Sequence, residues 1–176
     1  MFPPAPEITE SEAIRFGYGD ASLGIIAVAE SARGVVALLI GDDRERLRAD
    51  LEDVFPHATL VLDQSGLAPT IAKAVALVDA PHLGTDLTLD LRGSAVEVAV
   101  WRALQAIPAG ETRSYGSIAR SLPMAATAQD VGAACAANRV AVAVPCHRVV
   151  KSDGSISGYR WGVQRKRRLI NKEGVA

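Results

Sequence analysis

The chain has few cysteines and no long apolar run. It has two cysteines, Cys135 and Cys146, among 176 residues, and their spacing matches neither a redox pair nor a zinc-ligand pair. No run of about 18 uncharged apolar residues is present, so no segment is predicted to span a bilayer. The first residues lack the basic and apolar regions of a secretion signal. These absences predict a cytoplasmic protein without a disulfide framework.

Net charge is also nearly absent, but the charged residues are divided unevenly. The formal net charge is −1. Residues 1–90 contain 6 basic and 15 acidic residues, whereas residues 91–176 contain 13 basic and 5 acidic ones, so the two parts carry −9 and +8. A basic second half predicts contact with a polyanion such as DNA. The alternative is that two solvated faces of opposite sign attract each other.

The hydrophobic content of 49% is sufficient for a sizeable core, and the pattern along the chain predicts an α+β fold. Residues 1–12 are rich in Pro and Glu, which predicts a loose arm. We expect residues 13–91 to form an α/β domain on an antiparallel sheet. Residues 92–176 are expected to form a mostly helical domain, because helical patterns follow one another from Arg92 onward.

Several elements are predicted for the first half. Apolar stretches at 23–29 and 35–40, joined by a Gly-containing connector, predict a β-hairpin. The spacing of apolar residues predicts helices at 44–54 and 69–78. Alternation of apolar and polar residues at 87–91 predicts a short edge strand.

The second half contains two capping patterns that mark the starts of helices. Ser94 and Glu97 form one pattern, and Thr127 and Asp130 form the other. We predict helices at residues 95–106, 115–122, 131–137 and 163–172. Two of them, joined by a turn, have the outline of a helix-turn-helix, whose second helix would lie against DNA.

Cys146 is a candidate nucleophile, because His147 and Arg148 follow it directly. A thiol becomes reactive when it ionises, and an imidazole or an electropositive environment can lower its pKa. The apolar residues 141–144 predict a buried extended strand ahead of it. On an extended backbone neighbouring side chains point to opposite sides, so His147 reaches the sulfur only if the chain bends or a water bridges them. Cys135, in an alanine-rich run, fits a small buried hydrophobe.

The wider sequence resembles the O6-methylguanine-DNA methyltransferase family. The string PCHRVV at 145–150 is similar to the active-site signature of that family. The strings GETRSYG at 110–116, AAN at 136–138 and SGYRWG at 157–162 resemble its flipping-tyrosine, recognition-helix and binding-loop segments. The similarity is densest between about residues 90 and 173. It implies single-turnover DNA repair, in which the alkyl group of an O6-alkylguanine moves to Cys146 and the protein is consumed, with no cofactor.

The resemblance also implies catalytic roles for individual residues. Cys146 would be the alkyl acceptor, and His147 would take its proton through a water. Glu173 would orient and polarise the imidazole. Tyr115 would crowd the phosphate while the nucleotide rotates outward, and it would give a proton to the departing guanine. Asn138 would pin the turn ahead of the active segment.

The implied partner is double-stranded DNA that contains O6-alkylguanine, bound by a monomer without any membrane contact. The pocket for the flipped base would be lined or closed by Val149, Tyr159 and Arg160. The residues expected to contact DNA are Tyr115, Thr127, Gln129 and Ala136.

The sequence departs from the family pattern both in the recognition helix and in the first half. Gln129 stands where the family has an arginine that fills the space left by the flipped base, and Asp130 follows where a small neutral residue is usual. An uncharged residue and an acid near phosphates predict weaker DNA binding or slower flipping. The zinc ligands of some members are missing from the first half, where only His57 and His82 remain, so no metal is expected.

The candidate site residues also have explanations in which they serve only the fold. Glu173 could be a solvated helix residue, Tyr115 a half-buried core aromatic and Asn138 a helix stop. Trp101 and Trp161 are expected to be packing residues. The basic run at 165–168 fits either a solvated face or a phosphate contact.

Two other functions fit part of the pattern. One is a related protein that recognises alkylated bases and signals their presence without repair, but such relatives lack the acceptor cysteine. The other is a Cys-His hydrolase acting on acyl groups, which would process many substrate molecules per protein.

Overall fold

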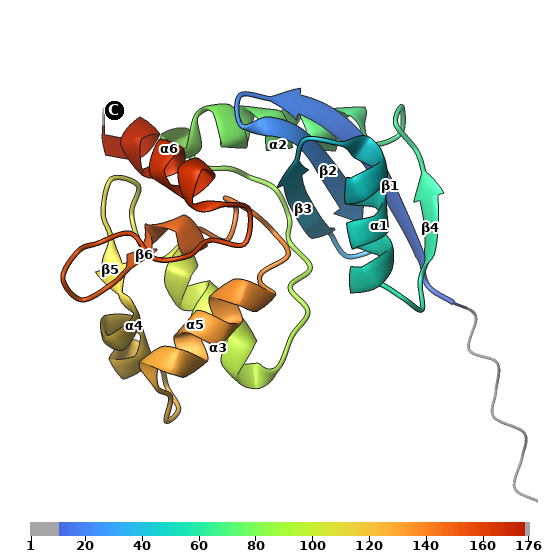
Figure 1. Ribbon diagram of the computed structural model, residues 1–176. Helices are drawn as coiled ribbons and strands as arrows, with labels where there is room; N and C mark the ends of the chain where they lie inside the picture. The colour runs from blue at the N-terminus through green and yellow to red at the C-terminus, as the bar shows by residue number, and fades with distance from the viewer. Residues whose placement is uncertain (1–10, 175–176) are drawn as a thin grey trace, which may run out of the picture.

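The computed structural model describes residues 11–174, so the predicted arm lies almost entirely outside the described residues. The strands are β1 (Ala13–Ala21), β2 (Gly24–Glu30), β3 (Val35–Gly41), β4 (Thr59–Leu62), β5 (Arg113–Ser114) and β6 (Val149–Val150). The helices are α1 (Arg44–Val54), α2 (Ala68–Asp79), η1 (Pro81–Leu83), α3 (Ala95–Gln105), α4 (Tyr115–Ser121), α5 (Ala128–Ala137), η2 (Cys146–Arg148) and α6 (Val163–Gly174). Strands β1–β4 and α1 gather in one part of the molecule and α3–α5 in another (Figure 1). The predicted α+β class is confirmed.

The larger sheet has the strand order β3-β2-β1-β4. Strands β1, β2 and β3 pair antiparallel, so the predicted hairpin of β2 and β3 is confirmed. The sheet is mixed, because β4 pairs parallel with β1 at the edge. Neither β1 nor β4 was predicted. Strand β4 is a mostly apolar run of only four residues, too short to show an alternating pattern, and three of the four are exposed at the edge of the sheet.

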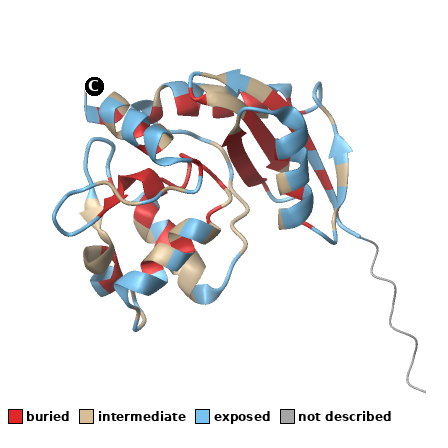
Figure 2. Ribbon diagram, viewed as in Figure 1, coloured by how far each residue is buried: buried red, intermediate tan, exposed pale blue. Residues whose placement is uncertain are grey.

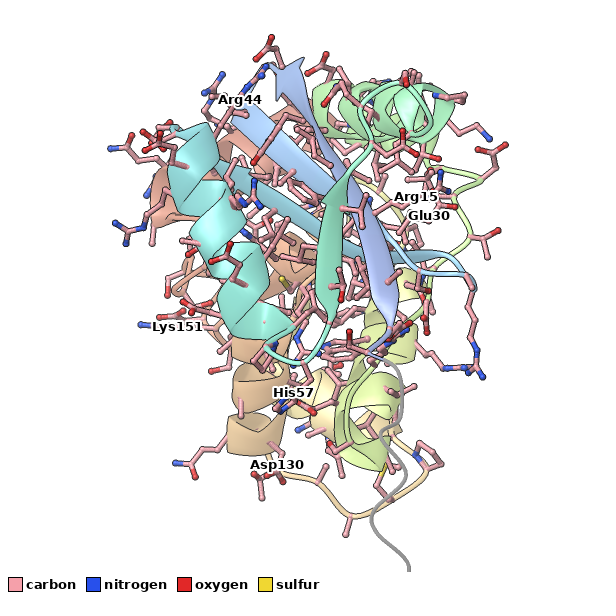
Figure 3. All side chains as sticks on the ribbon, turned by 90° about the vertical axis from the view of Figure 1, so that its right-hand side faces the viewer. Arg15, Glu30, Arg44, His57, Asp130 and Lys151 are labelled. Atoms are coloured by element: carbon pink, nitrogen blue, oxygen red, sulfur yellow. The ribbon has the colours of Figure 1, made fainter. Side chains whose placement is uncertain are left out.

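Helices α1 and α2 cover opposite faces of this sheet. Side chains alternate along β1, and Phe16 and Tyr18 lie under the guanidinium groups of α1, Arg48 being 5.5 Å from the Phe16 ring. Gly17 and Gly19 face α2, where an added Cβ would lie within 3 Å of Ile71 side-chain atoms. These glycines therefore allow α2 to approach the strand closely. Figure 3 views this part from the side of β4.

The free edge of β3 joins the two halves of the molecule. Val35 N donates to Thr88 O at 2.9 Å, and Leu38 N donates to Arg139 O at 2.8 Å. The predicted edge strand at 87–91 is wrong, since only Leu89 forms an isolated bridge, to Val35. Beside it, Ala141 N donates to Leu38 O at 2.9 Å. The segment that leads to Cys146 is thus hydrogen-bonded to the sheet of the first half.

The helices of the second half follow the capping patterns. The side chains of Ser94 and Glu97 form a reciprocal cap at α3, and those of Thr127 and Asp130 form one at α5, which begins three residues earlier than predicted. Trp101 is buried and donates from Nε1 to Ala134 O at 2.8 Å, so it packs α3 against α5 as expected. None of the helices in residues 11–174 is long and apolar enough to span a membrane.

Helix α6 carries the basic run, and two of its four residues bind the first half. Arg165 donates to Leu23 O at 2.9 Å and to Asp42 Oδ1 at 2.8 Å. Arg168 donates to Ser22 O at 3.0 Å, whereas Lys166 points inward and is completely buried. The run is therefore not a single solvated face, because two of its side chains bind the first half and a third is buried. The fourth, Arg167, is exposed. The opposite charges of the two halves meet here in part.

Candidate active site

Residues 140–145 form a tight turn, so the predicted extended strand at 141–144 is wrong. Val144 N donates to Val140 O at 3.0 Å, and Val142 has a φ of 67°. That conformation is uncommon for a β-branched residue, and valines by themselves favour a strand. The tertiary contacts override this preference, because all these side chains are buried in the core. Cys146 therefore begins the 3-10 turn η2 instead of ending a strand.

Asn138, the residue that ends α5, holds this turn with its side chain. Its Nδ2 donates to Val144 O at 3.0 Å, and its Oδ1 accepts from Val140 N at 2.9 Å. The same Nδ2 lies 3.2 Å from Cys146 Sγ. Asn138 is 1% exposed, so one buried amide links the end of α5, the turn and the thiol.

The two residues that follow Cys146 in the chain form a buried ionic cluster with a carboxylate of α6. His147 Nε2 lies 2.8 Å from Glu173 Oε1. Arg148 donates to both oxygens of Glu173, with the shortest contact, from Nη2, at 2.6 Å, and its Nη1 donates to Ile107 O at 2.7 Å. The turn η2 thus delivers His147 and Arg148 to one carboxylate of α6.

The protonation states of the cluster follow from its contacts. Burial alone raises the pKa of Glu173, but hydrogen bonds from His147 and Arg148 outweigh it and bring that pKa to about 2. Burial lowers the pKa of His147 despite the opposing effect of Glu173. Because ionised Glu173 only accepts, the neutral imidazole donates from Nε2 and keeps a lone pair on Nδ1. That Nδ1 is buried and has no hydrogen-bond partner among the described residues.

Cys146 opens onto a cavity of about 430 Å³. Its lining residues are Tyr115, Gly132, Cys135, Ala136, Cys146, Gly158, Tyr159 and Arg160. The thiol is 3% exposed, and burial raises its pKa, opposed by Asn138 and Lys166. Figure 2 shows the buried residues of the second half gathered around η2 and β6. A nucleophile at this place needs a base to remove its proton.

Cys135, which the sequence pattern marked only as a buried hydrophobe, also lines this cavity. It is half-buried, and burial raises the pKa of its thiol to about 12. The signal was helical spacing, because Gly132, Cys135 and Ala136 lie on one face of α5. The cavity therefore holds two thiols, and only Cys146 has the buried imidazole–carboxylate pair beside it in the chain.

Most of the other predicted site residues gather around this cavity. Tyr115 is half-buried at the start of α4, with its hydroxyl hydrogen-bonded to Ser157. Arg160 donates to Asn138 O at 2.5 Å. Tyr159 packs edge-on against the buried Trp161, a packing residue as expected. Val149 is completely buried in β6 and is not part of the lining.

The predicted DNA-contact residues on α5 lie along its exposed surface. Thr127 caps the helix, and its hydroxyl accepts from Asp130 N at 3.1 Å. Gln129 is exposed in the first turn, and Ala136 lies two turns later at the cavity. Because seven residues make two helical turns, Gln129 continues the face that borders the cavity. Figure 3 shows Asp130 at the end of the molecule farthest from Arg44.

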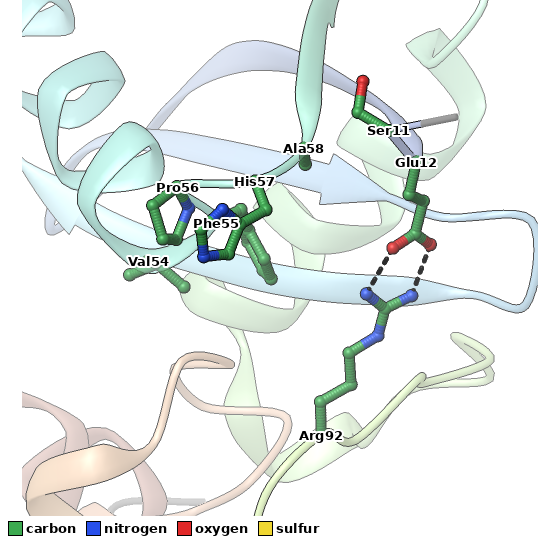
Figure 4. A pocket seen from close by; sticks show the side chains of 8 residues that line it. All are labelled: Ser11, Glu12, Val54, Phe55, Pro56, His57, Ala58 and Arg92. Atoms are coloured by element: carbon green, nitrogen blue, oxygen red, sulfur yellow. Dashed lines mark hydrogen bonds and ion pairs between the residues drawn. The ribbon is translucent and has the colours of Figure 1, made fainter. Parts of the chain in front are cut away.

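A larger cavity, of about 630 Å³, lies between Arg92 and the loop after α1 (Figure 4). Its Arg92 is already bound to Glu12 at 2.6 Å and to Asp90 at 2.8 Å. His57 lies on its opposite side, and His82 belongs to η1. Ser11 and His57 both line this cavity, but no hydrogen bond between them is found among residues 11–174, where the Ser11 hydroxyl is bonded to Thr59.

Comparison with known proteins identifies relatives of this chain. A family model described as the DNA-binding domain of 6-O-methylguanine DNA methyltransferase matches residues 95–175. The bifunctional transcriptional activator/DNA repair enzyme Ada of Escherichia coli is 41% identical over 164 residues, which are 93% of this chain and 46% of that protein. The chain thus spans about half the length of that relative. A methylated-DNA–protein-cysteine methyltransferase of Candida albicans is 36% identical over 121 residues, 68% of each chain.

Solved structures of similar proteins superimpose on nearly the whole chain. The O6-methylguanine methyltransferase of Mycobacterium tuberculosis superimposes with a TM-score of 0.74 at 30% identity, covering 92% of this chain and 93% of that one. The same organism's OGT in complex with DNA gives a TM-score of 0.75 at 31% identity and covers 93% of each chain. The sequence matches and the fold therefore lead to the same conclusion, that the chain belongs to the O6-methylguanine-DNA methyltransferase family.

Proposed function

We propose that this protein repairs DNA by moving the alkyl group of an O6-alkylguanine to Cys146 Sγ. The observation that carries the proposal is a buried thiol on a 430 Å³ cavity, next to a buried His147–Glu173 pair. Relatives named methylated-DNA–protein-cysteine methyltransferases support the assignment. The protein acts as a methylated-DNA–protein-cysteine S-methyltransferase that works once.

The proton of the thiol leaves through His147. Glu173 accepts from Nε2, so Nδ1 is the basic atom, and a water carries the proton from Sγ to it. The sulfur then attacks the alkyl carbon, a carbon–sulfur bond forms, and the bond between carbon and O6 breaks with its electron pair going to guanine. Tyr115 gives its phenolic proton to the departing base. The product is a thioether, which water does not hydrolyse, so the protein is consumed.

DNA is bound on the face formed by α4 and α5. The alkyl group on O6 lies inside a stacked duplex, so the nucleotide rotates out and its base enters the cavity. Gly132 and Ala136 leave room for it, and Gln129 stands beside the vacated position on the same helix face. Thr127 places the N-terminus of α5 toward the phosphates. A relative's structure in complex with DNA supports this partner, and we propose that the protein works as a cytoplasmic monomer.

The two alternative functions differ from the proposed one in what happens at the thiol. A protein that only signals the presence of damage needs no acceptor thiol, whereas Cys146 is present with a base beside it. A Cys-His hydrolase would use the same thiol and base, but water would release the acyl group from the sulfur, so the protein would show continued turnover. The number of substrate molecules processed per protein separates these functions.

Intact-mass analysis tests the proposal. Mixing the protein with an excess of duplex that contains one O6-methylguanine should add one methyl group, and peptide spectra should place it on Cys146. Cys146→Ala should gain nothing, while the matched control Cys135→Ala should still gain one methyl. A methyl group on Cys135, or turnover beyond one equivalent, contradicts the proposal.

A further inference from the structure

Lys166 is a completely buried cation without an acidic partner. It is 0% exposed, and no ion pair within residues 11–174 includes it. Its Nζ donates to Ser157 Oγ at 2.9 Å and lies 3.4 Å from Gly158 O. Burying a charge without a counter-charge is costly, and burial lowers the pKa of this ammonium. No contact of Lys166 within α6 explains that cost.

Ser157 connects this cation to the cavity. Its Oγ is hydrogen-bonded to both Lys166 Nζ and Tyr115 Oη. An ammonium only donates, so Ser157 accepts from Lys166. Its own hydroxyl proton is then free to be donated to the phenolic oxygen of Tyr115, which is one of the two directions that this hydrogen bond allows. In this arrangement the phenolic proton is not used in the bond to Ser157, and it stays available for a group in the cavity.

We propose that Lys166 and Ser157 are positioning residues, which direct the phenolic proton of Tyr115 toward the departing guanine. This inference rests on the proposed function. As the bond between the alkyl carbon and O6 breaks, its electron pair goes to guanine, and the proton of Tyr115 moves to the base. The phenolate that remains is held by the Ser157 hydroxyl and, through it, by the Lys166 charge. It recovers a proton from water after the base leaves.

The energetic reason is that charge develops in a place without solvent. A hydrogen bond to a charged oxygen is stronger than one to a neutral oxygen, and a donor held in place beforehand needs no reorganisation during the reaction. The Ser157–Tyr115 bond therefore strengthens as Tyr115 loses its proton. Its loss should slow the transfer step and leave the binding of DNA unchanged.

Single-turnover transfer from an O6-methylguanine duplex at saturating DNA provides the first test. Ser157→Ala should slow transfer by about 10-fold or more, the size expected for a hydrogen bond to a charged group. Ser157→Thr keeps the hydroxyl and should restore most of the rate. Lys166→Met should also slow transfer. The matched control is Ser155→Ala in the same loop, whose hydroxyl binds only Asp153 and whose loss should change nothing.

A double-mutant cycle with Tyr115→Phe provides the second test. Once the phenolic hydroxyl is absent, removing the Ser157 hydroxyl should have no further effect on the transfer rate. Alkylation of Cys146 by iodoacetamide serves as a reference reaction, because iodide leaves without a proton. Ser157→Ala should leave that rate unchanged, whereas a general disturbance of the cavity would lower both rates.

The outcomes distinguish this inference from the proposed function. A parent protein that accepts no methyl group overturns the proposed function and the inference with it. If the parent accepts one methyl group, two results overturn the inference alone. One is that Ser157→Ala transfers as fast as the parent, and the other is that Ser157→Ala slows transfer equally with and without Tyr115→Phe. Loss of rate with Ser157→Ala in the Tyr115 background only, restored by Ser157→Thr, supports it.

Discussion

His147 Nε2 lies 2.8 Å from Glu173 Oε1, and Arg148 Nη2 lies 2.6 Å from the same oxygen. One carboxylate oxygen therefore binds both an imidazole and a guanidinium. Arg148 also opposes the charging of His147, and burial lowers the pKa of that imidazole further. The neutral imidazole is the form that can accept a proton from a thiol, so Arg148 helps to keep His147 a usable base.

Removing the charge of Glu173 should slow the transfer step. Glu173→Gln keeps a side-chain oxygen near His147 but removes the negative charge that stabilises the imidazolium. We expect transfer to be slower by on the order of 100-fold, the usual size of general-base assistance, with DNA affinity nearly unchanged. Single-turnover kinetics at saturating DNA measure this, with Glu111→Gln on an exposed loop as the control. Equal rates for the parent and Glu173→Gln would remove Glu173 from the mechanism.

The same carboxylate predicts how stability depends on pH. Its folded-state pKa of about 2 lies below the ordinary value of 4.5, so its contribution is complete above pH 4.5 and is lost as the pH falls toward 2. The loss should be about 2 kcal/mol by pH 3. Burial also lowers the pKa of His147, so this residue makes the folded protein less stable as the pH falls below the ordinary imidazole pKa of 6.5. Denaturant unfolding between pH 7 and pH 3 should show a flatter profile for Glu173→Gln, and parallel profiles would contradict the assignment.

Gln129 is expected to limit both DNA binding and base flipping. Gln129→Arg adds a charge on the face of α5 that borders the cavity, which should steepen the salt dependence of binding by up to about one unit of log-log slope. The longer side chain should also fill the vacated stack and accelerate transfer at saturating DNA, and we expect this second effect to be larger. The control Gln105→Arg adds the same charge on α3. If Gln129→Arg changes neither quantity, another residue occupies the vacated stack.

Asp130 has two effects that one substitution can separate. Its carboxylate caps α5 by accepting from Thr127 N at 2.8 Å, so Asp130→Ala would destabilise the helix by about 1 kcal/mol while removing a charge. Asp130→Asn keeps an oxygen for the cap and removes only the charge. It should strengthen DNA binding without changing the transfer rate at saturating DNA. Affinity at two salt concentrations decides, since unchanged affinity would place Asp130 away from the phosphates.

The features that the sequence predicted correctly are those set by neighbouring residues. Ser94 with Glu97 and Thr127 with Asp130 mark the starts of α3 and α5, because a cap depends on residues three positions apart. The hairpin of β2 and β3 follows from two apolar runs and a short connector. The residues around Cys146 likewise pointed to a thiol with an imidazole beside it, without the geometry that makes the pair useful.

Distant contacts decided the rest. Residues 141–144 favour a strand locally, but the Asn138 side chain and the edge of β3 hold them in a turn, and this turn directs Cys146 and His147. Lys166 lies in a run of basic residues and is nevertheless buried, because the packing of α6 between the two halves turns it toward Ser157. A local pattern specifies which helix forms. Which side chain of that helix enters the core depends on what packs against it, and that is fixed only when the whole chain has folded.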